Sequence, residues 1–340
     1  MERNRRWMLA GLGAALLVAA QAGPAAAQGV TVGGLAYGQY LYKLKDTAGH
    51  ANSFSIQRAY INVVGRFNDG LLVRITPDVY TGTDGSILLR MKYAYAAYTP
   101  ANFPLTFKLG LIHTPWLDWA EGVWDYRMQG TMSPERSGYI TSSDLGFGVD
   151  GAWGKQMVNM QVGLYNGEGY HGGIGDKRKD VMGRVSVRVL PSDDAGSRGG
   201  LRLTAYGQYG KPTGGGKRSR LIGMLSYKSK LFTLATEGTI AQDSSTTTPA
   251  PDVTGRVLSG FGIFNIPNTK AALVARLDLA DPNKDVTGDS QTRFIGGVSY
   301  MVHPHLRLFA NLDYLHYQGT PTPTQEASRA QALFQMEFTF

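Results

Sequence analysis

The sequence predicts an all-β fold: a transmembrane antiparallel β-barrel of about sixteen strands, with one long loop folded inward as a constriction. Three observations lead to this prediction. Apolar and polar residues alternate with a period of two along most of the chain, which is typical of strands with two unlike faces. Full charges such as Arg184 and Arg188 stand in mid-strand in a segment rich in valine, where a packed soluble core would not accept them. Short and long connections also alternate, as on the two rims of an outer-membrane barrel.

The amino terminus is expected to be a cleaved signal peptide covering residues 1–27. Arg3, Arg5 and Arg6 precede an apolar stretch over 7–20, and Ala25 to Ala27 fit a small-residue cleavage site. A membrane anchor helix is the alternative, but the stretch is shorter than the ~20 residues that a helical span needs. Residues 28–340 are then the exported barrel. Export makes a nucleic-acid partner unexpected, although the formal net charge is +8.

The sixteen strands follow from the alternation and from the turn residues between the apolar runs. An even number suits a single-chain bacterial barrel. Counts of fourteen or eighteen stay open, because the connection 191–199 is long for the rim of short turns. Leu89, Met91, Tyr93 and Tyr95 are placed on the apolar outer face of one strand. The strands are expected near 31–44, 53–67, 71–80, 87–99, 104–112, 145–153, 157–165, 180–190, 200–210, 218–228, 230–240, 255–264, 270–280, 290–300, 305–316 and 327–340.

The charges on the inner wall indicate what the lumen prefers. A barrel of this size encloses water rather than a packed core. An excess of Arg and Lys along a pore favours anions. The alternative is that these cations only solvate the lumen and pair with the five acids predicted on the same wall, Asp78, Glu237, Asp278, Asp313 and Glu337. The basic residues expected to line the pore are Arg58, Arg66, Arg74, Arg90, Lys92, Lys108, Arg184, Arg188, Arg202, Arg276, Arg307 and Arg329.

The longest connection, 113–144, is predicted to be the constriction loop. It carries three tryptophans and is too apolar to stand in water, so we expect it to fold into the barrel. Asp118, Glu121 and Asp125 have the i, i+3, i+7 spacing of one helix face. Arg127 and Arg136 follow, so that acids and bases are expected to face each other across an eyelet. The residues assigned to the constriction are Trp116, Asp118, Trp119, Glu121, Asp125, Arg127 and Arg136, with Trp124 beside them.

Motifs for catalysis, metals and cofactors are weak or lack their context. The chain has no cysteine, which removes thiol chemistry. Gly146, Gly148 and Gly151 fit a dinucleotide-binding spacing, but no helix follows them. Asp118 and Glu121 have no companion nucleophile for a catalytic pair, and the pair His303 and His305 lacks further ligands. No catalytic residue, metal site or cofactor is therefore predicted.

Four segments resemble the phosphate-selective porin O/P family. They are Phe54–Tyr60 (FSIQRAY), Lys108–Pro115 (KLGLIHTP), Ser143–Gly146 (SDLG) and Val162–Gly167 (VGLYNG), in the family's order. The resemblance implies a sixteen-stranded homotrimeric porin of the outer membrane, with a constriction loop at 113–144 and a basic wall leading to it. Several members of that family are anion-selective. Phosphate-specific members carry a ladder of Arg and Lys, whereas the matching loop here has Arg127 and Arg136 but no lysine.

The expected function is passive diffusion of small hydrophilic solutes across the outer membrane of a Gram-negative-type bacterium. The expected partners are outer-membrane lipid and small solutes, anionic in preference and with phosphate as a candidate. One alternative is a general or sugar-preferring porin without anion selectivity, in which Trp116, Trp119 and Trp124 form a stacking surface. The other is a barrel enzyme or an inert anchor with a plugged lumen.

Overall fold

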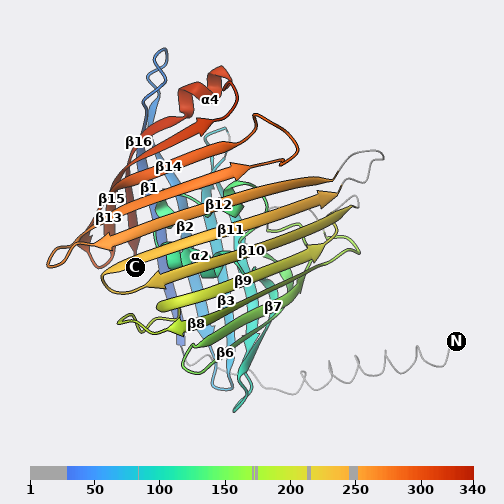
Figure 1. The fold of residues 1–340 in the computed structure, drawn as a ribbon. Coiled ribbons are helices and arrows are strands. Elements are labelled where there is room, and N and C mark those ends of the chain that lie inside the picture. Colours follow the sequence, from blue (N-terminus) through green and yellow to red (C-terminus); the bar gives the residue numbers. More distant parts are fainter. Residues whose placement is uncertain (1–28, 83, 171, 173–174, 213–215, 245–251) are drawn as a thin grey trace.

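A single closed barrel of sixteen antiparallel strands forms the described part of the chain (Figure 1). The computed structural model describes residues 29–82, 84–170, 172, 175–212, 216–244 and 252–340, so the predicted signal peptide lies outside them. Every strand pairs with its neighbours in sequence, and the first closes on the last. The predicted fold class and strand count are confirmed. The strands are β1 (Gly29–Lys43), β2 (Asn52–Arg66), β3 (Leu71–Thr81), β4 (Ile87–Tyr98), β5 (Leu105–His113), β6 (Ser143–Trp153), β7 (Val158–Tyr165), β8 (Asp180–Leu190), β9 (Gly200–Gly210), β10 (Lys217–Lys228), β11 (Phe232–Ser244), β12 (Val253–Asn265), β13 (Ala271–Asp281), β14 (Gln291–His303), β15 (Leu306–Tyr317) and β16 (Ala330–Thr339).

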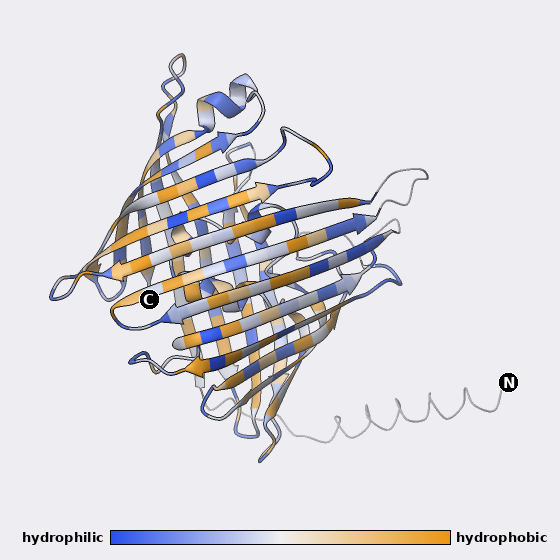
Figure 2. Cartoon of the chain, in the orientation of Figure 1, coloured by the Kyte–Doolittle hydropathy of each residue, from blue (hydrophilic) through white to orange (hydrophobic). Residues whose placement is uncertain are grey.

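The period-two pattern places apolar side chains outside the barrel and polar ones inside. In β9, Leu203 is 56% exposed on the outer face, whereas its neighbour Arg202 is fully buried on the inner face. Figure 2 shows this alternation of hydrophobic and hydrophilic residues along the strands. Among the described residues, no helix has the length and hydropathy needed to cross a membrane.

One strand changes its phase through a β-bulge, and the prediction for it is wrong in part. Thr76 of β3 pairs with Tyr93 of β4, but the next residue, Pro77, pairs with Met91, so Lys92 has no partner in this ladder. Proline lacks the N–H that a regular ladder needs at this point. The bulge keeps Lys92 inside together with Tyr93, which is buried, whereas Met91 is exposed outside. Tyr93 and Tyr95 therefore face the lumen, not the outer face as expected; Tyr95 lies opposite Arg74 in the ladder and its ring contacts that of His113.

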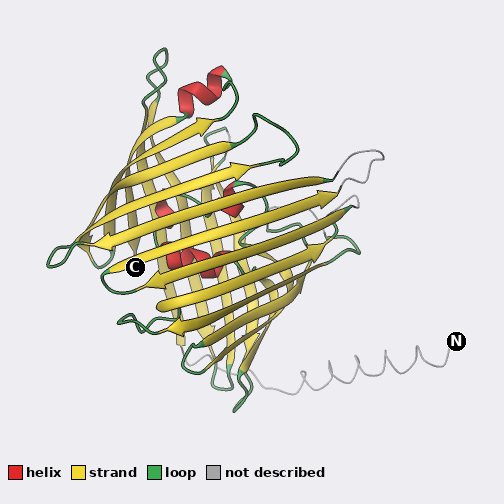
Figure 3. Ribbon diagram, viewed as in Figure 1, coloured by secondary structure: helices red, strands yellow, loops and turns green. Residues whose placement is uncertain are grey.

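The long loop between β5 and β6 folds into the barrel, as predicted (Figure 3). It contains helix α2 (Leu117–Trp124), the 3-10 turn η2 (Arg127–Gln129) and helix α3 (Ser133–Arg136). Trp116, Leu117 and Trp124 are completely buried. They belong to one apolar cluster with inward side chains of β9 to β15, which include Tyr206, Ile222, Met224, Phe261, Ile263, Val274 and Phe309. Removal of this apolar surface from water holds the loop against one side of the wall.

A short helix precedes the last strand and displaces one predicted pore residue. Helix α4 (Pro323–Ser328) begins with a capping box between Thr322 and Gln325, a pattern that favours a helical turn. The last strand consequently starts at residue 330 rather than 327. Arg329 is the C-cap of this helix and binds Glu326 at 2.9 Å and the hydroxyl of Tyr314 at 3.3 Å. Because Tyr314 points outward, Arg329 lies at the rim and not on the inner wall.

Candidate functional site

A cavity of about 470 Å³ lies beside the loop, between α2 and the inner wall of the first strands. Tyrosine, acidic and basic side chains meet in it. The lining residues are Leu35, Tyr37, Tyr60, Asn62, Arg74, Thr76, Lys92, Tyr93, His113, Asp118, Glu121, Gly122, Asp125, Arg127, Arg198 and Glu337. Since the opposite side of the barrel is filled by the apolar cluster, this cavity is the candidate for the narrow part of a channel.

A basic wall lies on the inner face of β2 to β4 and consists of Arg58 of β2, Arg74 of β3, and Arg90 and Lys92 of β4. Of these four cations, Arg74 and Lys92 line the cavity. Arg74 donates to the side-chain oxygen of Asn62 at 2.7 Å and to the hydroxyl of Thr76 at 3.0 Å. Lys92 donates to the hydroxyl of Tyr60 at 3.2 Å. Among the described residues, these two cations have no carboxylate partner. They are the part of the basic wall whose charge is least compensated.

Arg58 and Arg90 both contact the acid Asp78. Arg90 donates to Asp78 at 2.9 Å, and a guanidinium nitrogen of Arg58 lies 3.9 Å from the same carboxylate. Asp78 itself is fully buried behind them. Four cations therefore stand against one covered carboxylate on this side of the lumen.

Tyrosine rings hold the cations of the basic wall in place. The guanidinium of Arg74 lies 4.7 Å from the ring centre of Tyr93, and that of Arg90 lies 3.9 Å from Tyr80. The ammonium of Lys92 lies 4.9 Å from the ring centre of Tyr60. Such contacts stabilise a cation without cancelling its charge. The bulge that turns Tyr93 inward thus contributes to the electrostatics of the site.

The opposite side of the cavity carries Asp118, Glu121 and Asp125, as the helical spacing predicts. The C-cap residue Asp125 adopts a left-handed conformation (φ 57°), and all three acids line the cavity. Each has a basic neighbour: Arg198 lies 3.3 Å from Asp118, Arg127 lies 2.5 Å from Glu121, and Arg307 lies 3.4 Å from Asp125. The acidic side is therefore partly neutralised by cations in contact with it.

The Asp118 carboxyl stays ionised to low pH. Loss of hydration inside the barrel is the largest influence and raises its pKa, but the charges of His113, Arg198, Lys108 and Arg184 outweigh it and lower the pKa to about 2. The side chain is 51% exposed to the lumen, so it remains in contact with water. Asp118 consequently carries its negative charge throughout the neutral and mildly acidic range.

Of the two loop arginines expected to face the loop acids, Arg127 contacts them and Arg136 does not. Arg127 binds Glu121 and Glu135 of its own loop at 2.5 and 3.3 Å. Arg136 reaches the far wall, where it binds Asp278 of β13 at 3.1 Å. The guanidinium group of Arg127 therefore stays in the cavity beside the loop acids, and only that of Arg136 lies away from them. The acids of α2 share their cavity with Arg74 and Lys92 of the basic wall.

Several predicted pore-lining cations hold the loop rather than line open space. Arg184 donates to the carbonyl of Pro115 at 2.8 Å and lies 4.3 Å from the ring centre of Trp119. Arg276 donates to the carbonyl of Thr131, and Arg307 donates to that of Asp125 at 2.6 Å. All three guanidinium-bearing side chains are buried. They point inward as predicted but are covered by the loop.

The remaining predicted cations lie away from the cavity. Lys108 is paired with Asp150 of β6, and Arg202 is buried against the carbonyl of Gly199. Arg188 donates to the carbonyl of Lys155 at 2.8 Å. Arg66 is exposed at the end of β2. These four side chains are therefore not part of the basic wall.

The sequence analysis missed Arg198, which the connection 191–199 carries into the cavity. Its guanidinium donates to the Asp118 carbonyl at 2.9 Å and lies 4.8 Å from the ring centre of Trp119. The unusual length of this connection was the available signal. Arg218 and Arg220 of β10 were also missed, although they alternate with Leu221. They bind Asp180 and Asp243 at 3.3 and 2.9 Å.

The three loop tryptophans do not form a stacking surface for sugars. Trp116, Trp119 and Trp124 are buried between the loop and the wall. Elsewhere in the described residues, no group of three or more His, Asp or Glu side chains is arranged to hold a metal ion. His303 and His305 stack with ring centres 5.4 Å apart.

Comparison with solved structures finds porins and other outer-membrane proteins. The anion-selective porin from Comamonas acidovorans has a TM-score of 0.66 at 12% identity, over 92% of this chain and 99% of that one. A loop L8 deletion mutant of OmpT, an outer membrane protein of Vibrio cholerae, has a TM-score of 0.65 at 13% identity, over 92% and 99%. Salmonella typhi OmpF in complex with daunomycin has a TM-score of 0.65 at 13% identity, over 92% and 97%.

No protein-family model and no curated protein matches the sequence. The resemblance to the phosphate-selective porin O/P family therefore stays a prediction. At 12–13% identity the structural likeness concerns the fold. The chain is a closed barrel of sixteen strands, and its fold is similar to the folds of these porins.

Proposed function

We propose that this protein is an outer-membrane porin through which small hydrophilic solutes diffuse passively, with a preference for anions. The observation that carries the proposal is the cavity beside α2, where Arg74 and Lys92 present charges without a carboxylate partner among the described residues. The apolar outer face suits contact with lipid, and the polar inner face suits a water-filled channel. The fold of the chain, which it shares with porins, supports the same conclusion.

The arrangement of charges provides the selectivity. Fixed cations on a low-dielectric wall concentrate anions near them. An anion passing the constriction would move along the basic wall, while the acids opposite are partly neutralised by Arg127, Arg198 and Arg307. Phosphate is one candidate anion. A signal peptide over residues 1–27 would direct the chain to the outer membrane.

A homotrimer is part of the proposal. One structure of the same fold, OmpT of Vibrio cholerae folded in vitro, is described as a trimer form. Sedimentation of the refolded protein in detergent would test this assembly. We expect three copies per particle, and a monomer would contradict the expectation.

A second candidate is a general porin without charge preference. The cavity lining favours it, because Arg74, Lys92, Arg127 and Arg198 are matched in number by Asp118, Glu121, Asp125 and Glu337. If these charges cancel over the width of the channel, only solute size decides permeation.

Permeation of three sugars of similar size separates the two candidates. Proteoliposomes containing the protein would be tested with gluconate, glucose and glucosamine, which are anionic, neutral and cationic. We expect gluconate to enter fastest and glucosamine slowest. Equal rates would support the general porin. Rates equal to those of protein-free liposomes would contradict a channel. The protein would then be better explained as an anchor with a plugged lumen or as a barrel enzyme.

A further inference from the structure

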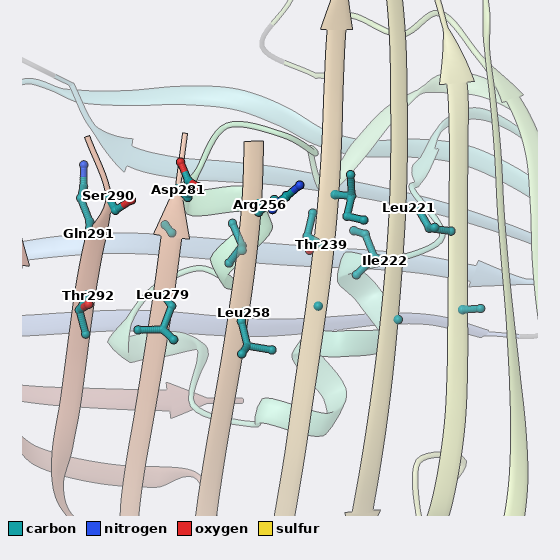
Figure 4. Close-up of a pocket in the computed structure, with 16 residues that line it drawn as sticks. Leu221, Ile222, Thr239, Arg256, Leu258, Leu279, Asp281, Ser290, Gln291 and Thr292 are labelled. Atoms are coloured by element: carbon teal, nitrogen blue, oxygen red, sulfur yellow. The ribbon is translucent and has the colours of Figure 1, made fainter. Parts of the chain in front are cut away.

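A groove of about 770 Å³ crosses the outer face of β10 to β14, near the ends of these strands that meet the longer connections (Figure 4). Its floor includes Gly223 of β10 and Gly238 of β11. A Cβ atom built on either glycine would meet no atom within 4 Å. Space is therefore left open on a face where neighbouring positions carry large apolar side chains.

The walls of the groove are apolar and accessible. Leu221 is 60% exposed and Leu258 is 52% exposed, and Leu279 stands beside them on the next strand. We assign this surface to the membrane. An open glycine floor between apolar walls can accommodate a hydrocarbon chain there. Packing of the chain against these side chains supplies the favourable contact.

One end of the groove is polar. Arg256 of β12 lies on the outward phase of its strand, two residues before Leu258, and its side chain is exposed. Asp281 ends β13 directly opposite Arg256 in the ladder, and Gln291 begins β14. Figure 4 shows these residues toward the strand ends, with Thr292, Leu279 and Leu258 one level below. The groove is thus amphipathic along the direction of the strands.

Arg256 is in an unusual place for a cation. Within the described residues it forms no ion pair, whereas the inward arginines of this barrel are bonded to acids or carbonyls. An arginine on the lipid side of a barrel is unfavourable at the bilayer centre and is tolerated near the interface. Asp281 lies opposite Arg256 in the ladder but forms no ion pair with it. A lipid phosphate is available at that depth and accepts two parallel hydrogen bonds from a guanidinium.

We propose that this groove binds a phosphorylated, acylated glycolipid of the outer leaflet. The phosphate pairs with Arg256, and sugar hydroxyl or amide groups bond Asp281 and Gln291. One acyl chain lies over Gly223 and Gly238, between Leu221 and Leu258. The inference rests on the proposed outer-membrane function, because it requires the end with longer connections to face the outer leaflet.

Matched variants separate the charge of the groove from its shape. Arg256→Gln removes the charge, and Lys217→Gln is its control, because Lys217 is an exposed cation of β10 that does not line the groove. Gly238→Val places a side chain in the open space on the floor of the groove and so tests the shape of the groove. Gly207→Val is the control for shape, because Gly207 of β9 has the same open space but lies outside the groove.

Binding would be measured by native mass spectrometry of the refolded full-length mature protein in detergent, titrated with bisphosphorylated lipid A. Loss of a charge-assisted hydrogen bond corresponds to a weakening of about tenfold or more. We expect that weakening in Arg256→Gln and in Gly238→Val, with Lys217→Gln and Gly207→Val like the parent. The parent should bind dephosphorylated lipid A weakly, with about the affinity that Arg256→Gln has for lipid A. The Arg256→Gln variant should bind lipid A and dephosphorylated lipid A equally.

Three results would overturn the proposal. Equal affinities of Arg256→Gln and Lys217→Gln would remove the role of the charge. Equal binding of phosphatidylglycerol and lipid A would show that a phosphate suffices and that the sugar is not recognised. A change in the number of protein copies per particle in Gly238→Val would show that the groove holds a second copy of the chain. The conductance of the same samples tests the porin function separately, since lipid binding is scored by mass.

Discussion

Trp116 donates its indole N–H to the Glu237 carboxylate at 3.0 Å, and both side chains are buried inside the barrel. The bond joins the loop to β11 across 121 residues of sequence. Glu237 uses one oxygen for this bond, and its other oxygen has no partner among the described residues. The position of the loop, and hence the width of the cavity beside it, depends on this contact.

Trp116→Phe is expected to loosen the constriction loop. The change keeps an aromatic ring in the apolar cluster but leaves the buried carboxylate of Glu237 without its donor, at a cost of about 1–3 kcal/mol. Single-channel recordings should show larger current noise and a higher mean conductance. Trp153→Phe, on the outer face of β6, is the matched control, and noise equal to that of the control would contradict the prediction.

Charge reversal on the basic wall is expected to change ion selectivity. Replacing Arg74, Arg90 and Lys92 by Glu should shift the zero-current potential in a salt gradient toward cations, because the field along the anion path changes sign. Arg329→Glu is the control: it reverses one charge in the same way, but at the rim. The zero-current potential of this variant should stay close to that of the parent. Unchanged selectivity in the triple variant would contradict the role of the basic wall.

Asp118→Asn is expected to increase anion preference at neutral pH, because it removes one negative charge from the constriction. The pKa of Asp118 is lowered to about 2 from 3.8. Its ion pair with Arg198 therefore contributes fully above pH 3.8 and is lost as the pH falls through about 2. The difference in zero-current potential between the parent and the variant should persist to about pH 3, fall to about half near pH 2 and vanish at about pH 1. A difference that fades between pH 5 and 4 would contradict the lowered pKa.

Arg198→Ala is expected to lower anion preference and to widen the channel. The change removes the guanidinium group that pairs with Asp118 and takes a side chain from the cavity lining. Arg198→Lys should restore most of the selectivity, since it returns the charge. Zero-current potential and conductance would be compared for the two variants, and equal values for Ala and Lys would show that Arg198 only fills space.

The sequence predicted the strands well because their signal is local. Alternation around Leu203 or Val185 reports the two faces of a strand without knowledge of its neighbours. The change of phase at Lys92 was missed because it arises from the pairing of Pro77 with Met91 on a neighbouring strand. Thr322, Pro323 and Gln325 form a pattern that indicates the start of helix α4. The helix was not predicted because the alternation of the following strand was extended back to residue 327.

The site was predicted less completely because its contacts are distant in sequence. The helix face of Asp118, Glu121 and Asp125 followed from spacing alone. Arg184 and Arg276 were placed on the inner wall correctly, but only the fold shows that Trp119 and Trp124 cover them. The length of the connection 191–199 marks it as unusual, but only the fold shows that it carries Arg198 to α2.

The zero-current potential of the parent protein tests the central proposal most directly. The refolded protein would be inserted in a planar bilayer between two concentrations of potassium chloride, whose ions have nearly equal mobility in water. The basic wall predicts a potential of the sign that chloride permeation produces. A potential of the opposite sign, or one near zero, would contradict anion preference and show that the acids of α2 balance or outweigh Arg58, Arg74, Arg90 and Lys92.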